Sequence, residues 1–228
     1  MLLCALRDPD DEVVQSAIFA LGHRESPRAI EALLPFVEHP CADFRYASVH
    51  GLMPHDTPAV VDALIRLCRD ADRDVRDWAT FTLGSQFESD SPSLRAALHE
   101  RLTDADPEIR GEALRGLARR RDTGIASVVQ HELEGEFHGD WAVEAAELLC
   151  DPQFLPALRR LYERLGDDAL IEKAATSQLA AITCPSSRFF GRLPKTEIDL
   201  NSSMSALACS RPLCESQTIT GILTRAES

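Results

Sequence analysis

The sequence predicts an all-α protein, and three observations support this prediction. Ala and Leu dominate the apolar residues, only 6% of the residues are aromatic, and similar segments recur every 31 to 34 residues. Ala and Leu favour helices, and no segment alternates apolar and polar residues over the length of a strand. We therefore expect an α-solenoid, in which repeated helix pairs stack without a β-sheet.

The repeat is clearest in a helix that follows each acidic turn. The segments DPDDEVVQSAIFALG, DADRDVRDWATFTLG and DADPEIRGEALRGLA begin at Asp8, Asp70 and Asp104. In five units, the first apolar residue of this helix is followed by a small residue four positions on and by leucine eight positions on. The three sets are Val13, Phe44, Val75, Ile109 and Trp141; Ala17, Ser48, Ala79, Ala113 and Ala145; and Leu21, Leu52, Leu83, Leu117 and Leu149. This spacing is one stripe of an α-helix, so we expect these residues in the core and Gly84 at the end of its helix.

A second helix type lies between these helices. The segments ESPRAIEAL, DTPAVVDAL and DSPSLRAAL each place a hydroxyl residue before a proline. Ser26, Thr57 and Ser91 are predicted N-caps, with the proline at the first helical position, where no N–H is needed. In DTGIASVV a glycine replaces the proline, and Thr123 is the predicted cap.

The ends of the repeat array differ from its middle. LLCAL corresponds only to the end of a first helix, so the first unit is expected to be truncated. A sixth unit around Leu170 and Ala174 is degenerate, because Leu179 is one position out of register. Beyond Cys184, 12 of 44 residues are Ser or Thr. We expect a repeat array over residues 1–182 and a Ser/Thr-rich, largely disordered tail over residues 183–228.

The acidic-turn motif resembles the second helix of HEAT repeats of the short, phycobilisome-lyase-like type. The shared pattern is an acidic turn, Val-Arg, a mid-helix Ala and a final Ala-Leu-Gly, over roughly residues 1–182. The resemblance implies a right-handed α-solenoid of about five to six HEAT-like repeats. Function is implied only weakly, because one scaffold of this kind serves many activities.

The resemblance also implies a structural Asp–Arg ladder along the array, with each aspartate six residues before an arginine. Asp70 with Arg76 and Asp104 with Arg110 match this spacing. In the first unit Val14 replaces the arginine, and in the second unit His39 replaces the aspartate that precedes Arg45. We therefore expect the ladder to be broken in the first two units, and the fifth unit, which has Ala142, lacks it too.

Charge limits the classes of partner. The net charge is −13, and the chain up to Cys184 carries 19 basic and 33 acidic residues. A body of this sign repels phosphate backbones, so nucleic acid is not the expected partner. No stretch is long and apolar enough to span a membrane, and the acidic start does not fit a signal peptide, so we expect no membrane association and a cytoplasmic location.

The resemblance implies that the second helices line a concave face. If positions 0, 4, 5 and 8 are buried, positions 2, 3 and 6 of these helices point into the concavity. The candidate partner-binding residues there are Phe19, Tyr46, His50, Asp77, Trp78, Phe81, Glu112, Arg115, Glu144 and Glu147, and the other five positions hold Gln15, Ser16, Ala47, Gly111 and Val143. Clustered aromatic residues on a surface favour binding, although packing between repeats is the alternative role for Trp78 and Phe81.

Catalytic and metal sites are not expected. His99-Glu100 and His131-Glu132 are one repeat apart, and deoxyhypusine hydroxylases, which are HEAT-like, bind iron through such pairs early in the second helix. Here both pairs fall at the ends of first helices, where histidine complements the helix dipole. No C-x-x-C pair, nucleophile motif or phosphate-binding glycine loop is present, so we expect no metal, cofactor or catalytic residue.

Two functional hypotheses remain. The first is a non-catalytic protein–protein interaction scaffold that binds a protein or peptide on its concave face, with a basic segment of the partner opposite the acidic half. The alternative, suggested by relatives of the family, is a bilin lyase-like or chaperone-like accessory protein that handles a tetrapyrrole chromophore. Both hypotheses use the surface formed by Tyr46, His50, Trp78 and Phe81.

Overall fold

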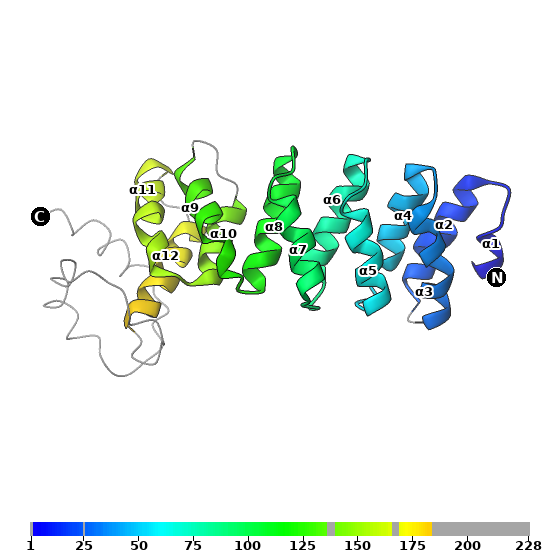
Figure 1. The fold of residues 1–228 in the computed structure, drawn as a ribbon, viewed down its shortest axis with the longest axis horizontal. Helices are drawn as coiled ribbons and strands as arrows, with labels where there is room; N and C mark the ends of the chain where they lie inside the picture. The colour runs from blue at the N-terminus through cyan, green and yellow to red at the C-terminus, as the bar shows by residue number, and fades with distance from the viewer. Residues whose placement is uncertain (1, 25, 136–139, 166–168, 184–228) are drawn as a thin grey trace, which may run out of the picture. The chain divides into compact units, whose positions relative to one another are not determined.

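The computed structural model describes residues 2–24, 26–135, 140–165 and 169–183, and within these ranges all regular structure is helical. This confirms the predicted α-solenoid (Figure 1). The chain divides into two compact units, Met1–Leu149 and Cys150–Ser228. The predicted boundary between array and tail stays a prediction, because residues 184–228 lie outside the described residues.

The first unit contains five pairs of helices. The first helices of the pairs are α1 (Leu2–Ala5), α3 (Pro27–Leu33) with the 3-10 helix η1 (Leu34–Glu38), α5 (Pro58–Leu67), α7 (Pro92–Arg101), and α9 (Ala126–Glu134) preceded by η3 (Thr123–Ile125). The second helices are α2 (Asp11–Gly22), α4 (Ala42–Leu52), α6 (Arg73–Phe81), α8 (Pro107–Arg119) and α10 (Asp140–Leu149). The second unit contains η4 (Pro152–Phe154), α11 (Leu155–Leu165) and α12 (Ala169–Thr183).

Acidic caps start most of the second helices. The side chains of Asp10, Asp72 and Asp106 accept hydrogen bonds from the first backbone amides of α2, α6 and α8. These amides have no partner within their helix, so each aspartate fixes the residue at which its helix begins. The acidic turns of the repeat therefore act as helix caps.

The predicted caps of the first helices are confirmed only in part. Ser26, Thr57 and Ser91 occupy the N-cap positions before prolines, but only Ser91 uses its side chain, accepting from the Leu94 amide at 3.2 Å. The prediction for Thr123 is wrong. Asp122 is the cap there, and its carboxylate accepts from the Gly124 amide at 2.9 Å.

The predicted core stripe is present, with one change of register. Ala17, Leu21, Ala79, Leu83 and their equivalents up to Leu117 and Ala145 are buried, whereas Leu149 is half-buried and Val13 is 39% exposed. Val14 is buried in its place, because it completes an i, i+3, i+4, i+7 stripe with Ala17, Ile18 and Leu21. One residue turns a helix by about 100°, so Val13 lies well away from that stripe.

Glycines bring neighbouring second helices into close contact. A Cβ atom added at Gly116 of α8 would lie 2.5 Å from the Cα of Gly84, and one at Gly22 of α2 would lie 2.7 Å from the carbonyl oxygen of Gly51 in α4. No side chain fits at such distances without moving backbone. The backbones therefore pack directly at two of the junctions between units.

Gly84 does not end its helix, contrary to the prediction. The chain continues from α6 into a π-helical turn, η2 (Thr82–Gln86), closed by a hydrogen bond from the Phe87 amide to the Thr82 carbonyl at 3.0 Å. Gly84 is instead the point at which η2 contacts α8.

Among the described residues, no helix is long and apolar enough to cross a membrane.

Candidate functional site

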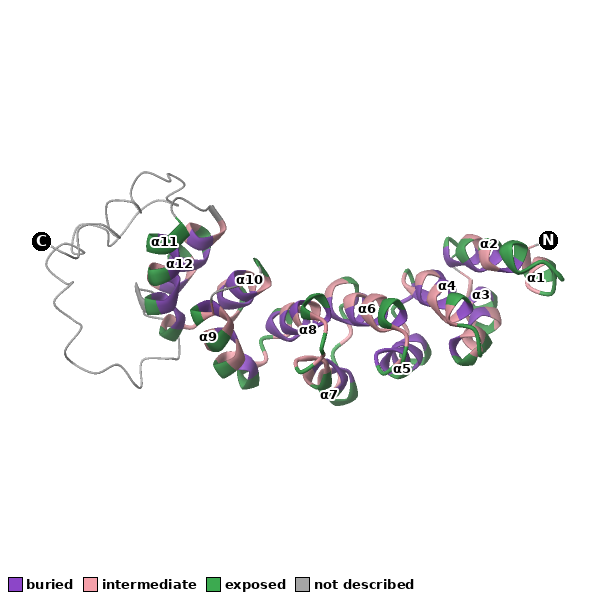
Figure 2. Cartoon of the chain, turned by 90° about the horizontal axis from the view of Figure 1, so that it is seen from above, coloured by how far each residue is buried: buried purple, intermediate pink, exposed green. Residues whose placement is uncertain are grey.

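The second helices of the first unit form one continuous row. Successive members of the series α2, α4, α6, α8 and α10 contact one another directly. Figure 2 shows this row on the inner side of the curve of the first unit, with α3, α5 and α7 on the outer side. We call the row formed by α2, α4, α6, α8 and α10 the inner row, and the ten candidate residues belong to these five helices.

All ten candidate residues are at least partly exposed. Phe19 is 40% exposed, and the other nine candidates are half-buried. Three further positions predicted to point into the concavity are buried instead: Ala47, Gly111 and Val143. Gly111 is covered by the indole of Trp141, since a Cβ there would lie 2.4 Å from that ring.

The five aromatic-ring candidates make a connected cluster across three helices. The His50 ring lies 5.5 Å from Phe19, 4.5 Å from Tyr46 and 4.4 Å from Trp78, measured between ring centroids. Trp78 lies 5.5 Å from Phe81 in an edge-to-face arrangement. The separation and tilt of Trp78 and Phe81 are those that aromatic pairs prefer. We call Phe19, Tyr46, His50, Trp78 and Phe81 the aromatic cluster.

His50 is the centre of the aromatic cluster. Its Nε2 atom is buried and has no hydrogen-bond partner among the described residues, and burial lowers the pKa of the imidazole below its usual value. The rings of three neighbours take the place of water around it. The neutral imidazole is therefore the form that this environment favours.

The inner row becomes acidic beyond α6. Arg115 donates to Glu144 at 2.5 Å and to Glu112 at 2.8 Å, and Ser85 donates to Glu112 at 2.8 Å. One arginine thus connects carboxylates on α8 and α10. Glu147 is half-buried on α10, next to the same surface.

Asp77 lies where the aromatic cluster meets the acidic part. Burial raises the pKa of its carboxyl, Arg73 opposes that rise at 3.4 Å, and Glu108, Asp106 and Glu112 reinforce it by repulsion. Arg73 is itself shared, because it also pairs with Asp74, Asp106 and Glu108. The carboxylates at this junction outnumber the cations that neutralise them.

Each of two ladder arginines, Arg45 and Arg76, bonds to the aspartate side chain of the next repeat and not to a side chain of its own repeat. Arg76 donates to the carboxylate of Asp104 in the next unit at 2.8 Å and to the backbone carbonyl of Asp70 at 2.9 Å. Arg45 donates in the same way to Asp70 at 2.6 Å and to the carbonyl of His39 at 2.8 Å. The expected break of the ladder at Arg45, in the second repeat, is therefore wrong. The residue six positions before the arginine supplies only a backbone oxygen, so it need not be an aspartate.

Arg110 repeats the backbone half of this pattern. It donates to the carbonyl of Asp104 at 2.8 Å. The residue that corresponds to Asp104 in the next unit is Glu136, which lies outside the described residues.

The two predicted His-Glu pairs occupy the positions expected from sequence. His99 and His131 lie in the last turns of α7 and α9. His99 Nε2 lies 3.2 Å from the carboxylate of Asp122, and Glu100 pairs with Arg69 at 2.7 Å. Among the described residues, no group of three or more His, Cys, Asp or Glu side chains could hold a metal ion.

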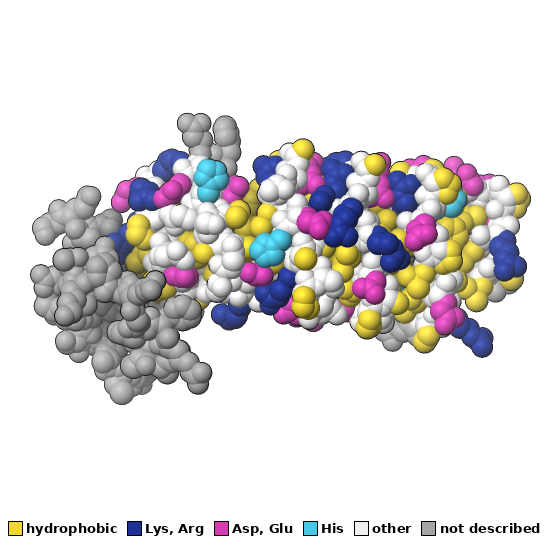
Figure 3. All heavy atoms as spheres, in the orientation of Figure 1, with side chains coloured by type: hydrophobic (Ala, Val, Ile, Leu, Met, Phe, Trp, Pro, Cys, Tyr) yellow, Lys and Arg dark blue, Asp and Glu magenta, His cyan; other side chains and the backbone are white. Residues whose placement is uncertain are grey.

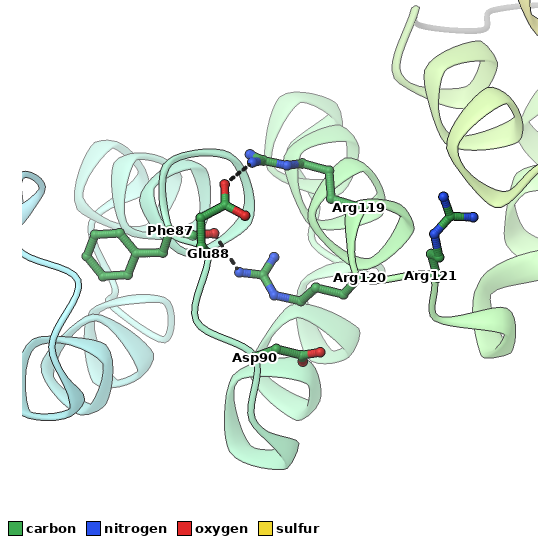
Figure 4. Close-up of a pocket in the computed structure, with 6 residues that line it drawn as sticks. All are labelled: Phe87, Glu88, Asp90, Arg119, Arg120 and Arg121. Carbon is green, nitrogen blue, oxygen red and sulfur yellow. Dashed lines mark hydrogen bonds and ion pairs between the residues drawn. The ribbon is translucent and has the colours of Figure 1, made fainter.

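Sequence reasoning missed the role of Arg120. This half-buried side chain donates to the carbonyls of Leu83, Phe87 and Ser89 at 2.8 to 3.0 Å, and thereby holds the end of η2 against α8. Figure 4 shows it beside Arg119, which pairs with Glu88 at 2.8 Å. Phe87 points away from these arginines and is buried. Arg119 and Arg121, the two neighbours of Arg120, are exposed, whereas Arg120 is not.

The pocket in Figure 4 is small and of mixed charge. Its walls combine Glu88 and Asp90 with Arg119, Arg120 and Arg121. Charges also alternate on the face in Figure 3, where acidic and basic side chains lie interspersed over the middle of the array. The inner row differs from both, because its aromatic side chains lie on α2, α4 and α6 and its acidic side chains lie mainly on α8 and α10.

Comparisons with known proteins agree with the fold. A family model described as HEAT repeats matches residues 1–84 and 67–131, more than half of the chain. Protein YibA of Escherichia coli (strain K12) is 30% identical over 149 residues, which cover 65% of this chain and 53% of that protein. The chain thus matches about half of the length of this relative.

Solved structures with similar folds include other helical repeat proteins. The X-ray structure of YibA has a TM-score of 0.69 at 29% identity, covering 78% of this chain and 66% of that one. A designed armadillo repeat protein in complex with the peptide (KR)4 has a TM-score of 0.59 at 18% identity, covering 78% and 97%. The complex of CpcE and CpcF of phycocyanin lyase from Nostoc sp. PCC7120 reaches a TM-score of only 0.41 at 13% identity, covering 78% and 92%, too low to bear on function.

Proposed function

Because the chain belongs to the HEAT-repeat family, we propose that its inner row is a non-catalytic surface that binds a protein or peptide segment. The aromatic cluster is the observation that carries this proposal. Trp78 and Phe81 are half-buried, and Phe19 is 40% exposed at the edge of the same cluster. Large rings that remain accessible on a repeat surface are favoured anchors for a partner.

The arrangement of the cluster supports binding without a large conformational change. Contacts with His50 hold Phe19, Tyr46 and Trp78 in place before any partner arrives. A partner therefore gains apolar contact without the entropic cost of ordering loose side chains. The inner row is made of helices, which position these rings more firmly than loops would.

A basic segment is the partner chemistry that the rest of the inner row favours. Asp77, Glu112 and Glu144 lie along it, and Arg115 is shared between two of them. A cation from a partner would add to Arg73 and Arg115, whereas a phosphate backbone would be repelled. The designed armadillo protein with (KR)4 is similar in fold alone, and it illustrates that a helical solenoid can hold such a peptide.

The alternative is a bilin lyase-like or chaperone-like role. The same rings would then stack on a tetrapyrrole, with His50 or Asp77 near its polar groups. Co-expression with a bilin pathway separates the two roles by absorbance. Bound pigment, lost in a Trp78→Ala variant, would favour the alternative, and a colourless protein that still captures a partner would exclude it.

The proposed function is tested with the double variant Trp78→Ala/Phe81→Ala. We expect it to lose proteins that the wild-type chain captures, and to retain the wild-type helical circular dichroism. Phe36→Ala is the matched control, because Phe36 is also a half-buried aromatic residue but lies in η1, outside the inner row. Equal capture by the double variant and the wild type, confirmed by titration with one purified partner, would refute the proposal.

A further inference from the structure

The inner row is divided into two zones along the array. Its fifteen predicted positions contain no charged side chain in α2 and α4, where they hold Gln15, Ser16, Phe19, Tyr46, Ala47 and His50. They contain no aromatic residue in α8 and α10, where they hold Gly111, Glu112, Arg115, Val143, Glu144 and Glu147. At these positions only α6 carries both kinds, with Asp77 beside Trp78 and Phe81, and the one further ring near the row is that of Trp141, which covers Gly111.

At its six predicted positions the apolar zone holds no carboxylate, and its acidic residues, Asp11, Glu12 and Asp43, are confined to the first turns of α2 and α4. Its one titratable ring at the centre, His50, is held among Phe19, Tyr46 and Trp78, with Nε2 buried. A lysine or arginine placed directly over the rings of Phe19, Tyr46 and His50 would lose water without gaining a carboxylate from these positions. Apolar side chains are the ones that this zone fits.

The acidic zone has the opposite character. Arg115 is shared by Glu112 and Glu144, and Arg73 by Asp77, Asp106 and two further carboxylates. Repulsion among these carboxylates contributes to the raised pKa of Asp77. A cation supplied from outside would therefore be stabilised along α8 and α10, whereas an apolar side chain would take water from these carboxylates without adding a positive charge.

From this division we propose that the partner segment is bipartite: an apolar half lies over α2, α4 and α6, and a Lys/Arg-rich half lies over α8 and α10. The proposal rests on the proposed function, because it specifies the occupant of the same inner row. Neighbouring helices pack about 8–10 Å apart, so the four spacings between five helices span roughly 32–40 Å. An extended chain rises about 3.3 Å per residue, so the segment has roughly 10–12 residues.

The test uses peptides of one composition and different order. Each contains six Leu or Phe and six Lys or Arg residues, arranged either as two blocks, in both directions, or in alternation. We expect a block peptide in one direction to bind the full chain at least tenfold more tightly than the alternating peptide. Equal affinity of block and alternating peptides would overturn the bipartite arrangement.

Variants locate the basic half. Glu112→Gln/Glu144→Gln should weaken binding of the block peptide at least fivefold and leave the helical circular dichroism unchanged. Glu31→Gln/Asp62→Asn is the matched control, because these exposed carboxylates lie on α3 and α5. An equal loss in both double variants would show a general effect of charge and would overturn the placement over α8 and α10.

Failure of this inference is distinct from failure of the proposed function. If no peptide binds but Trp78→Ala/Phe81→Ala still abolishes capture of a partner, the bipartite segment is wrong and the inner row remains a binding surface. If that double variant changes neither peptide binding nor capture, the proposed function fails, and the bipartite segment fails with it.

Discussion

The imidazole of His50 lies 4.4 Å from the indole of Trp78, and this contact joins the second helices of two neighbouring repeats. His50 belongs to α4 and Trp78 to α6. The same imidazole reaches Phe19 on α2, so one side chain connects the aromatic residues of three units. The cluster is therefore a property of the stacked array, and no single repeat contains it.

The first prediction concerns the charge of His50. Burial lowers the pKa of this imidazole, so between that value and about 6.5 the unfolded chain binds more protons than the folded chain. The folded state should therefore lose stability as the pH falls from about 6.5 to the lowered pKa of His50. His50→Phe should reduce this part of the pH dependence, measured by urea unfolding from pH 7.5 to 5.5. An unchanged pH profile in the variant would contradict the prediction.

The second prediction concerns the ladder between units. Arg45 and Asp70 are 17% and 8% exposed and share two hydrogen bonds, of 2.6 and 2.8 Å. Asp70→Ala should lower the free energy of unfolding by about 2 kcal/mol, because it leaves a mostly buried arginine without its carboxylate. Glu100→Ala is the control, since it breaks an exposed pair with Arg69 and should cost about 0.5 kcal/mol. Equal losses would refute a structural role for the ladder.

The ladder also predicts acid sensitivity. Burial alone would raise the pKa of Asp70, but hydrogen bonds from Arg45 and from the Asp72 amide outweigh it and hold the pKa below its usual value. A carboxyl of lowered pKa contributes stability above its unfolded pKa of about 4, and this is lost as pH falls through the folded value. Asp70→Asn should therefore flatten the stability profile below about pH 4.

The third prediction concerns the glycine contact between η2 and α8. Gly116→Ala would place a methyl group 2.5 Å from the Cα of Gly84, so the two backbones must separate. We expect a loss of about 2 kcal/mol in unfolding free energy, as for other overpacked positions. Gly124→Ala is the control, because its nearest neighbour, at 3.0 Å, is the side-chain oxygen of Asp122. Equal stability of the two variants would contradict the close approach.

The fourth prediction concerns Arg120. Its guanidinium bonds to the carbonyls of Leu83, Phe87 and Ser89, so Arg120→Met should speed hydrogen exchange at the Phe87 amide, which closes η2. Arg121→Met should leave that amide protected, because Arg121 is exposed. Unchanged exchange in Arg120→Met would show that η2 is stable without the arginine.

The sequence predicted the array because its signals are local and repeated. Periodic alanines and leucines, acidic turns and prolines each act within one helix, as the buried Ala79 and Leu83 show. Features that depend on the next unit were partly or wholly missed. Arg45 bonds to a carboxylate 25 residues away, and Arg120 to carbonyls more than 30 residues away, and neither leaves a mark in the local pattern.

The sequence also predicted only part of the candidate site. The helical period placed Phe19, Tyr46, His50, Trp78 and Phe81 on one surface, and the resemblance to HEAT repeats indicated which one. The helical period could not show that His50 would contact three of the other rings, because these contacts depend on how neighbouring helices pack. It also placed Ala47, Gly111 and Val143 on the surface, although inter-helix packing buries them.

The central claim, that a partner segment lies on the aromatic cluster, is tested most directly by the fluorescence of Trp78. The chain has two tryptophans, so Trp141→Phe leaves Trp78 as the only indole. Titration with the block peptide should shift the emission of Trp78 saturably, with the same dissociation constant as measured by calorimetry. Binding seen by calorimetry with no change in Trp78 emission would place the partner elsewhere and contradict the claim.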